Sequence, residues 1–430
     1  MIKIDSELGP TDAVDIDLYF KKKYSDSGFY LFLSATKKEH QCTFLLQSSD
    51  DKLAKLYNIC IKLHAGAYNI LSLCQEQVRI MNRISETETD WITEPLWFVC
   101  HQMIQYCSTD TAQLENCGRL IHRSFNLCLN DRNPVLSSNR KSGSYSLANL
   151  EFIIYHKLKN RDMMKNLVKV LQSRNMDIIM DQPSNKEKNS IKVGHMVRYY
   201  YYLGEYYGCF ESDFNKASTF LSIALLHCNF NYKTHIAKIL VLLVPFVIVS
   251  RKMYPNEKVL TQLLSATGQY GEKLFKFIIQ LVYCLKSGDI HGYDKFVSSN
   301  EVFLLKNGIY VAMCHIRELV FLKFFKTCTK MIGNNKTIVP LSSIAEVYGN
   351  YSQRKKKIRR LINMKSKKDT KIPIDITSLE NKEMNENMDE LECLLANLIN
   401  KGFIKGYLSH SNRCIVLSKN DAFPHLSSSL

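Results

Sequence analysis

The sequence lacks the short motifs that mark most nucleotide-binding, hydrolytic and metal-dependent active sites. No GxSxG, HExxH, Walker-type glycine loop or GxGxxG is present. The small-residue run of Ala65, Gly66 and Ala67 has a single glycine and lies inside a helical pattern with no strand before it. We therefore predict that the chain is not an enzyme and that it binds no cofactor.

Closely paired cysteines are also missing. The fourteen cysteines are scattered, and none forms a CxxC pair. A zinc site built from Cys100, His101, Cys107, Cys117 and His122 is not expected, because gaps of six and nine residues between its cysteines do not match zinc-finger spacing. We predict reduced thiols in the core, no bound metal and a reducing compartment.

Long apolar runs and a secretory leader are absent as well. The longest apolar run, residues 236–249, contains Lys238 and Pro245 and is shorter than the roughly twenty residues that cross a bilayer. It predicts a buried core helix with a kink at Pro245. The N-terminal segment has acidic residues and no apolar core like that of a signal peptide. We expect a protein of the cytosol or nucleus with no membrane insertion.

Positive charge is what the chain has in excess. It holds 57 Lys and Arg against 41 Asp and Glu, a formal net charge of +16 over 430 residues. This balance favours association with polyanions, either nucleic acid or acidic proteins. The alternative is a soluble protein without a specific polyanionic partner, because net charge by itself argues for solubility and non-specific binding.

Helical periodicity dominates the sequence. No alternation of strands and helices appears before residue 400, which argues against Rossmann and barrel folds. Segment 195–228 resembles a tetratricopeptide helical hairpin if one loop residue is inserted. The positions that carry this resemblance are Tyr200, Leu203, Gly204, Tyr207, Ala217, Leu221 and Ala224. An aromatic helix pair of no particular family is the alternative.

Polar stretches suggest how the chain is divided. Residues 130–146 and 180–195 are rich in Ser, Asn and charged side chains, which is typical of exposed loops. We predict N-terminal helical repeats over residues 1–190, a second helical-repeat part over 191–335, and a winged helix over 336–430.

The winged helix is predicted from a change of pattern. Helices are expected at residues 319–331, 344–348 and 388–400, with Ser342 and Ser343 before the second. Gly402 ends the third helix, and two alternating strands then flank the polar turn 410–413. The third helix and the wing of such a unit can reach a nucleic acid. The candidate phosphate-binding cations are Lys401, Lys405, Arg413 and Lys419, and an ordinary solvated surface charge is the alternative for each of them.

One segment carries a family resemblance. The run CLLANLINKGFIKGYLSHSNRCIVLSKNDAFPHL, residues 393–426, resembles the C-terminal end of the PCI domain-containing protein 2 family. The runs YYLG (201–204), ILVLLVPF (239–246) and FLLKNGIYVA (303–312) extend the resemblance over roughly residues 190–430. It implies an all-α fold in which a tetratricopeptide-like helical-repeat superhelix leads into a C-terminal winged helix, the two forming a PCI domain.

The same resemblance implies a function and partners. It indicates a non-catalytic scaffold subunit of the second transcription-export complex, which couples transcription to mRNA export. The implied partners are a large helical scaffold subunit, a small acidic disordered subunit, and RNA or DNA. The implied location is the nucleus, including the nuclear pore, with shuttling to the cytoplasm.

The sequence departs from that family between residues 350 and 385, where a longer basic segment replaces a short connection. Its charge density predicts disorder and attraction to phosphate. A nuclear-localisation signal, an added nucleic-acid contact and a passive solvated insertion all remain open. The cations concerned are Arg354, Lys355, Lys356, Lys357, Arg359 and Arg360.

Two other functions stay open. The first is a PCI subunit of the proteasome lid, the signalosome or a translation-initiation complex. The second, from another class, is a free-standing winged-helix DNA-binding regulator, which would bind one duplex sequence far more tightly than random RNA.

Overall fold

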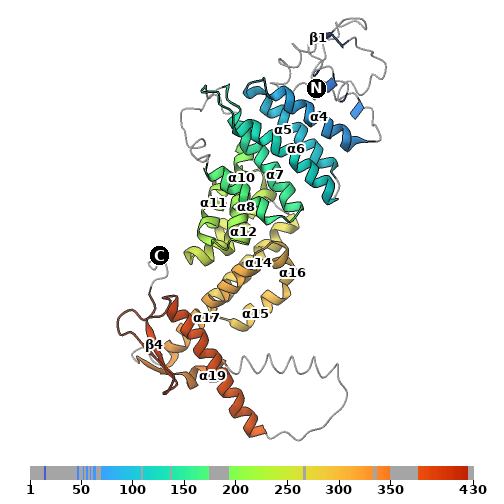
Figure 1. The fold of residues 1–430 in the computed structure, drawn as a ribbon. Coiled ribbons are helices and arrows are strands. Elements are labelled where there is room, and N and C mark those ends of the chain that lie inside the picture. Colours follow the sequence, from blue (N-terminus) through green and yellow to red (C-terminus); the bar gives the residue numbers. More distant parts are fainter. Residues whose placement is uncertain are drawn as a thin grey trace, which may run out of the picture. The chain divides into compact units, whose positions relative to one another are not determined.

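The computed structural model of the 430-residue chain describes most of the sequence from residue 69 onward (Figure 1). The described ranges are 69–107, 110–135, 138–173, 193–264, 268–332, 337–348 and 376–424, with short pieces before residue 64. Two of these pieces, β1 (Val14–Asp15) and β2 (Leu46–Gln47), pair in parallel. The side chains of α19 are described from Met388 onward.

The chain divides into two compact units. Unit 1 comprises Met1–Tyr206 and Ile223–Cys228, and unit 2 comprises Tyr207–Ser222 and Asn229–Leu430. The three-part division predicted at residues 190 and 335 stays a prediction.

Unit 1 is a helical array. Its helices are α4 (Ile70–Ser85), η2 (Asp90–Ile92), α5 (Thr93–Tyr106), α6 (Thr111–Leu129), η4 (Arg140–Gly143), α7 (Ser144–Lys157), α8 (Arg161–Ser173) and α10 (Val193–Glu205). Helices α4 and α6 run in the same direction, because Gln75 pairs with Asn116 near their starts and Asn82 accepts from the Ser124 hydroxyl further along.

Helix α7 forms the centre of unit 1. Residues Ser144 to Phe152 are all buried, including Tyr145 and Phe152 at 0% exposure. The one carboxylate among them, Glu151, lies 3.1 Å from His122 Nδ1 and accepts from the Tyr155 hydroxyl at 3.2 Å. A buried carboxylate requires such partners, so this group is part of the packing of the core.

The π-helical turn η6 (Tyr206–Phe210) lies in unit 2 from Tyr207 onward, and α11 (Phe214–His227) lies in unit 2 as far as Ser222. The other helices of unit 2 are α12 (Lys233–Arg251), α13 (Glu257–Leu264), α14 (Gly268–Ser287), α15 (Ile290–Ser299), α16 (Glu301–Lys306), α17 (Tyr310–Ile332) and a short helix at 341–348. A long C-terminal helix, α19 (Ile376–Asn400), follows.

Helix α12 corresponds to the long apolar run. It is long and apolar enough to cross a membrane by length and composition, but 72% of its most apolar window is buried within the protein. Pro245 lies inside this helix, where it cannot donate to the carbonyl four residues earlier. The buried side chains support the expected core helix.

The tetratricopeptide-like positions lie where the sequence predicts. Tyr200, Leu203 and Gly204 are buried on α10, and Tyr207 is 8% exposed in η6. Ala217, Leu221 and Ala224 on α11 are each fully buried. The all-α class is confirmed, with a small sheet near the C-terminus.

That small sheet differs from the prediction in one strand. Besides β4 (Gly406–Ser409) and β5 (Cys414–Leu417) it contains β3 (Ile338–Pro340), and the order is β3-β5-β4, all antiparallel. Ser342 and Ser343 were expected before the second helix, but that helix begins at residue 341. Val339 and Pro340, just before it, pair with Ile415 and Cys414. Helix α19 also begins at Ile376, so residues 376–385 are helical rather than part of an unstructured insertion.

Candidate interaction surface of the C-terminal sheet

The sheet is held together by its central strand. Ile415 on β5 is 0% exposed and Leu417 is 8% exposed, as expected for a strand flanked on both sides. Gly406 begins β4 at a point where a Cβ would lie 2.3 Å from the Val416 carbonyl oxygen. Only glycine allows this approach, so the wing depends on a residue without a side chain.

The end of α19 positions the cations that flank the wing. Gly402 has a φ of +72°, its N–H donates to Ile399 O, and the Phe403 N–H donates to Leu398 O. This double hydrogen bond is the Schellman pattern that commonly terminates a helix. The predicted helix end is therefore correct, and it places Lys401 just before the turn and Lys405 just after it.

Arg413 lies in the wing turn, with a φ of +47°. Its Nη1 is 2.6 Å from Asp389 Oδ1 and 3.0 Å from Glu392 Oε1, both on α19. The hydrogen bonds that Arg413 donates to Asp389 and Glu392 raise the pKa of Arg413, so the guanidinium stays charged. His410 Nδ1 adds a contact of 2.7 Å to Glu392 Oε2. The side chains of Arg413 and His410 thus hold the wing turn against α19.

Lys401 is paired as well. Its Nζ lies 2.7 Å from Oε1 and 2.5 Å from Oε2 of Glu318 on α17. Lys252 follows α12, and its Nζ lies 5.3 Å from the centroid of the Phe403 ring. Glu318 also interacts electrostatically with Lys252. Burial lowers the pKa of Lys252, Glu318 opposes that shift, and Lys401 adds to it. Glu318 therefore pairs with Lys401 and also favours the charged form of Lys252.

The remaining predicted cations differ from one another. Lys405 Nζ is 3.4 Å from Asp421 Oδ2, with both side chains more than half exposed. Lys419 is exposed and makes no ion pair with any other described residue. The six cations from Arg354 to Arg360 lie outside the described residues, so their proposed roles stay predictions, as does nuclear location.

The charge of α19 was missed in the sequence analysis. Between Ile376 and Asn400 the sequence contains six acidic residues and a single lysine. Of these acids, Asp389 and Glu392 pair with the wing and Glu390 accepts from the Tyr348 hydroxyl at 3.0 Å. A helix of this charge repels phosphate, unlike the helices that enter nucleic-acid grooves. A count of charges along the predicted helix would have revealed this.

The sheet has two outer edges. Neither β3 nor β4 pairs with a further strand among the described residues. β3 contains Pro340, which lacks an N–H and protects an edge from further pairing. β4 has no proline, and its Tyr407 is 63% exposed. The edge of β4 is therefore the more open one.

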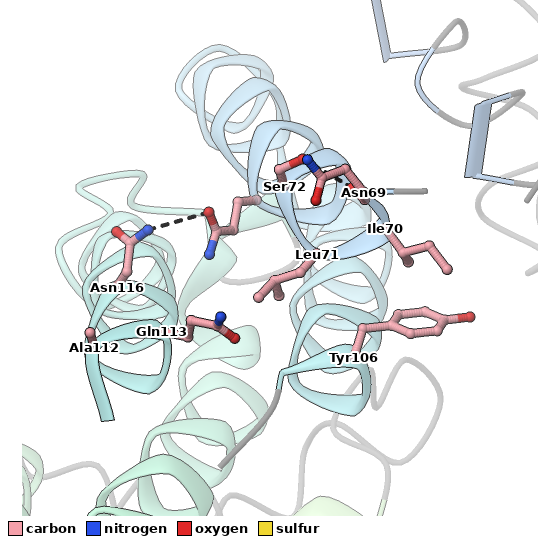
Figure 2. Close-up of a pocket in the computed structure, with 9 residues that line it drawn as sticks. Asn69, Ile70, Leu71, Ser72, Tyr106, Ala112, Gln113 and Asn116 are labelled. Carbon is pink, nitrogen blue, oxygen red and sulfur yellow. Dashed lines mark hydrogen bonds between the residues drawn. The ribbon is translucent and has the colours of Figure 1, made fainter. Parts of the chain in front are cut away.

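A separate cavity of about 630 Å³ lies in unit 1, between the first turns of α4 and α6 and the end of α5 (Figure 2). Four amide side chains line it, and Asn116 Nδ2 donates to Gln75 Oε1 at 3.3 Å. The Ser72 hydroxyl donates to the Asn69 carbonyl and not to a side chain that could act as a general base. The lining contains no carboxylate, imidazole or amine, so it offers hydrogen bonds but no acid–base pair.

Comparison with known proteins identifies the family. A family model described as the PCI domain matches residues 297–419, which include the sheet and α19. The Cop9 signalosome complex subunit 12 of Saccharomyces cerevisiae is 34% identical over 96% of this chain and 99% of its own length. This chain belongs to the COP9 signalosome subunit 12 family. Members from Candida glabrata and Eremothecium gossypii, at 34% and 31% identity, cover 88% and 89% of the chain and match over 84% and 90% of their own lengths.

The family relationship corrects the resemblance drawn from the last residues. The prediction of a PCI domain is confirmed, but its assignment to the PCI domain-containing protein 2 family is wrong, because the near-full-length relatives are named as signalosome subunits. The predicted function in the second transcription-export complex and in mRNA export is wrong for the same reason. The implied export partners, a large scaffold subunit and a small acidic subunit, are no longer supported. The alternative that named the signalosome was the better one.

Proposed function

We propose that this chain is a non-catalytic, architectural subunit of a COP9 signalosome-type complex. The observation that carries the proposal is the similarity to a subunit of that name across 96% of this chain and 99% of the relative. A match over nearly the whole of both chains includes both compact units rather than the PCI domain alone.

The outer edge of β4 is the surface that we assign to a neighbouring subunit. An open edge strand presents unpaired N–H and C=O groups, to which a strand of another protein can add. The exposed phenol of Tyr407 provides an aromatic contact of the kind enriched at protein interfaces. At the opposite edge Pro340 removes one donor, which directs strand addition to β4.

A non-catalytic role is supported by the chemistry of the described residues. No group of three or more His, Cys, Asp or Glu within them is placed to hold a metal ion. The buried carboxylate Glu151 is engaged by His122 and Tyr155 inside the core of unit 1. The amide-lined cavity provides no nucleophile with a neighbouring base.

Affinity purification of the tagged full-length chain, followed by mass spectrometry, tests the proposal. We expect other subunits of a signalosome-type complex, and we expect Tyr407→Asp to reduce their recovery at least tenfold by placing a charge on the β4 edge. Tyr283→Asp is the matched control, because Tyr283 is equally exposed, at 65%, but lies on α14. Recovery of proteasome-lid or initiation-factor subunits instead would overturn the assignment.

A further inference from the structure

Helix α8, which Figure 1 labels, forms a strongly basic segment of unit 1 together with the turn before it and the last residue of α7. From residue 157 to residue 173 the sequence has five cations and one acid, Asp162. All five cations are exposed, and we call them the α8 cation row: Lys157, Lys159, Arg161, Lys165 and Lys169. None of them was singled out by the sequence analysis.

The amphipathic pattern of α8 fixes which way this row faces. Met164, Leu167, Val168 and Leu171 are at most 4% exposed, so the apolar face of the helix packs into the protein. Arg161, Lys165 and Lys169 are spaced four residues apart along the opposite face, which separates them by about 6 Å along the helix axis. The row is therefore a line of charges rather than a cluster.

Three of the cations are not neutralised by any residue that the structure describes. Within the described part of the chain, Lys157, Lys159 and Lys169 form no ion pair, whereas Arg161 and Lys165 have interactions of their own. Lys159 is held in a left-handed turn with a φ of 54°, and Asn160 next to it accepts a hydrogen bond from the Met163 N–H at 3.1 Å. This turn fixes where the chain carrying Lys157 and Lys159 lies relative to the start of α8.

We propose that the α8 cation row binds the phosphate backbone of a nucleic acid without reading its bases. A line of positive side chains with one acid among them complements a polymer that carries one negative charge on each nucleotide. Helix α8 has no aromatic residue that could stack on a base, and lysine contacts to phosphate carry no sequence information.

Two other polyanionic partners fit this face less well. A membrane surface would bind an amphipathic helix through its apolar face, and that face of α8 is already buried. Interfaces with proteins are enriched in aromatic residues and depleted in lysine. The apolar side chains exposed on α8 are limited to Met163 and Val170, at 39% and 40%. A nucleic acid needs neither an apolar centre nor a stacking platform.

The test measures binding of the full-length chain to a labelled oligouridylate by fluorescence anisotropy over a salt series. In Lys157→Ala/Lys159→Ala/Lys169→Ala, the slope of log K against log salt should become shallower by about 2, since each lost contact to a single strand removes about 0.7. Affinity at low salt should fall at least tenfold. Replacing the same three lysines by arginine should preserve both quantities, because the interaction requires only positive charge.

The matched control removes three exposed lysines from unit 2, as Lys273→Ala/Lys276→Ala/Lys306→Ala. It has the same net charge and should retain affinity within twofold. Equal losses in the two triple variants would overturn the proposal, because they would show a response to net charge alone. A wild-type chain that bound polyglutamate or anionic vesicles through these lysines but not oligouridylate would also overturn it. Parallel measurements with oligothymidylate and duplex DNA distinguish the kind of nucleic acid.

Discussion

The cations of the winged helix and those of α8 carry the same charge in opposite surroundings. In the winged helix, Arg413 lies against Asp389 and Glu392, and Lys401 lies against Glu318. Lys157 at the end of α7 and Lys169 on α8 have no ion-pair partner among the described residues. A net charge of +16 therefore does not show where a polyanion would bind, because paired cations are already neutralised locally.

The difference follows from the helices that these cations face. Helix α19 has an excess of acidic residues and lies beside the wing, so it attracts the wing cations. Helix α8 contains one acidic residue and buries an apolar face, so its charges point toward solvent. The more informative measure of a basic surface is the number of cations left without a nearby acid.

The largest expected effect comes from removing the carboxylates that pair with the wing, which should make the wing resemble α8. In the variant that lacks the three α8 lysines, Asp389→Asn/Glu392→Gln should restore oligouridylate binding, because Arg413 and His410 lose their carboxylate partners. The salt slope should steepen by about 0.7 for each cation that gains a phosphate.

The control for that release is Glu301→Gln/Glu346→Gln, which removes two exposed acids elsewhere and changes the net charge equally. We expect no restoration of binding in this control. If Asp389→Asn/Glu392→Gln also fails to restore binding, pairing is not what keeps the wing from binding the oligonucleotide.

A smaller effect concerns stability. Glu318→Gln should lower the free energy of unfolding by about 1 kcal/mol, because a partly buried ion pair is lost and two lysines then face each other. Burial already lowers the pKa of Lys252, and loss of Glu318 lowers it further. The charged form of Lys252 is then disfavoured in the folded variant. The difference in unfolding free energy between the variant and the wild-type chain should therefore shrink as the pH rises through the pKa of Lys252 in the folded protein, because the lysine becomes neutral.

Urea unfolding at neutral and alkaline pH measures this deficit, with Glu272→Gln as the control on α14. A deficit that grows with pH would contradict the assigned direction of the Lys252 pKa.

The smallest effect should appear in the α8 cation row. Lys157→Ala/Lys169→Ala should change the free energy of unfolding by no more than about 0.5 kcal/mol, because neither side chain has an ion-pair partner among the described residues. Thermal denaturation of this variant beside the wild-type chain checks the prediction. A clear loss of stability would show that these lysines have a structural role. They would then resemble Lys401, and our proposal that they are available to a nucleic acid would be contradicted.

Local patterns were predicted well where neighbours in sequence decide the outcome. The helix predicted at residues 388–400 is the last part of α19, and its predicted end at Gly402 is correct. In both cases the determining contacts span a few residues. The strand β3 was missed because Val339 pairs with Ile415, far along the chain, and a three-residue strand has no periodicity of its own.

The assignment of a family shows the same limit. A run of about thirty residues was enough to indicate a PCI domain, because that run contains the end of α19, the wing and the central strand. It was not enough to distinguish branches that share this local pattern. The distinction came from similarity along nearly the whole chain.

By itself the sequence determined the helical class, the ends of several helices and the total positive charge, since these depend on composition and on residues three or four positions apart. The tertiary structure alone decided which charges are available. Lys401 and Glu318 are distant in sequence yet 2.7 Å apart in space, and Arg413 meets α19 only once the wing has folded back. Pairing depends on distance in space, and folding sets that distance.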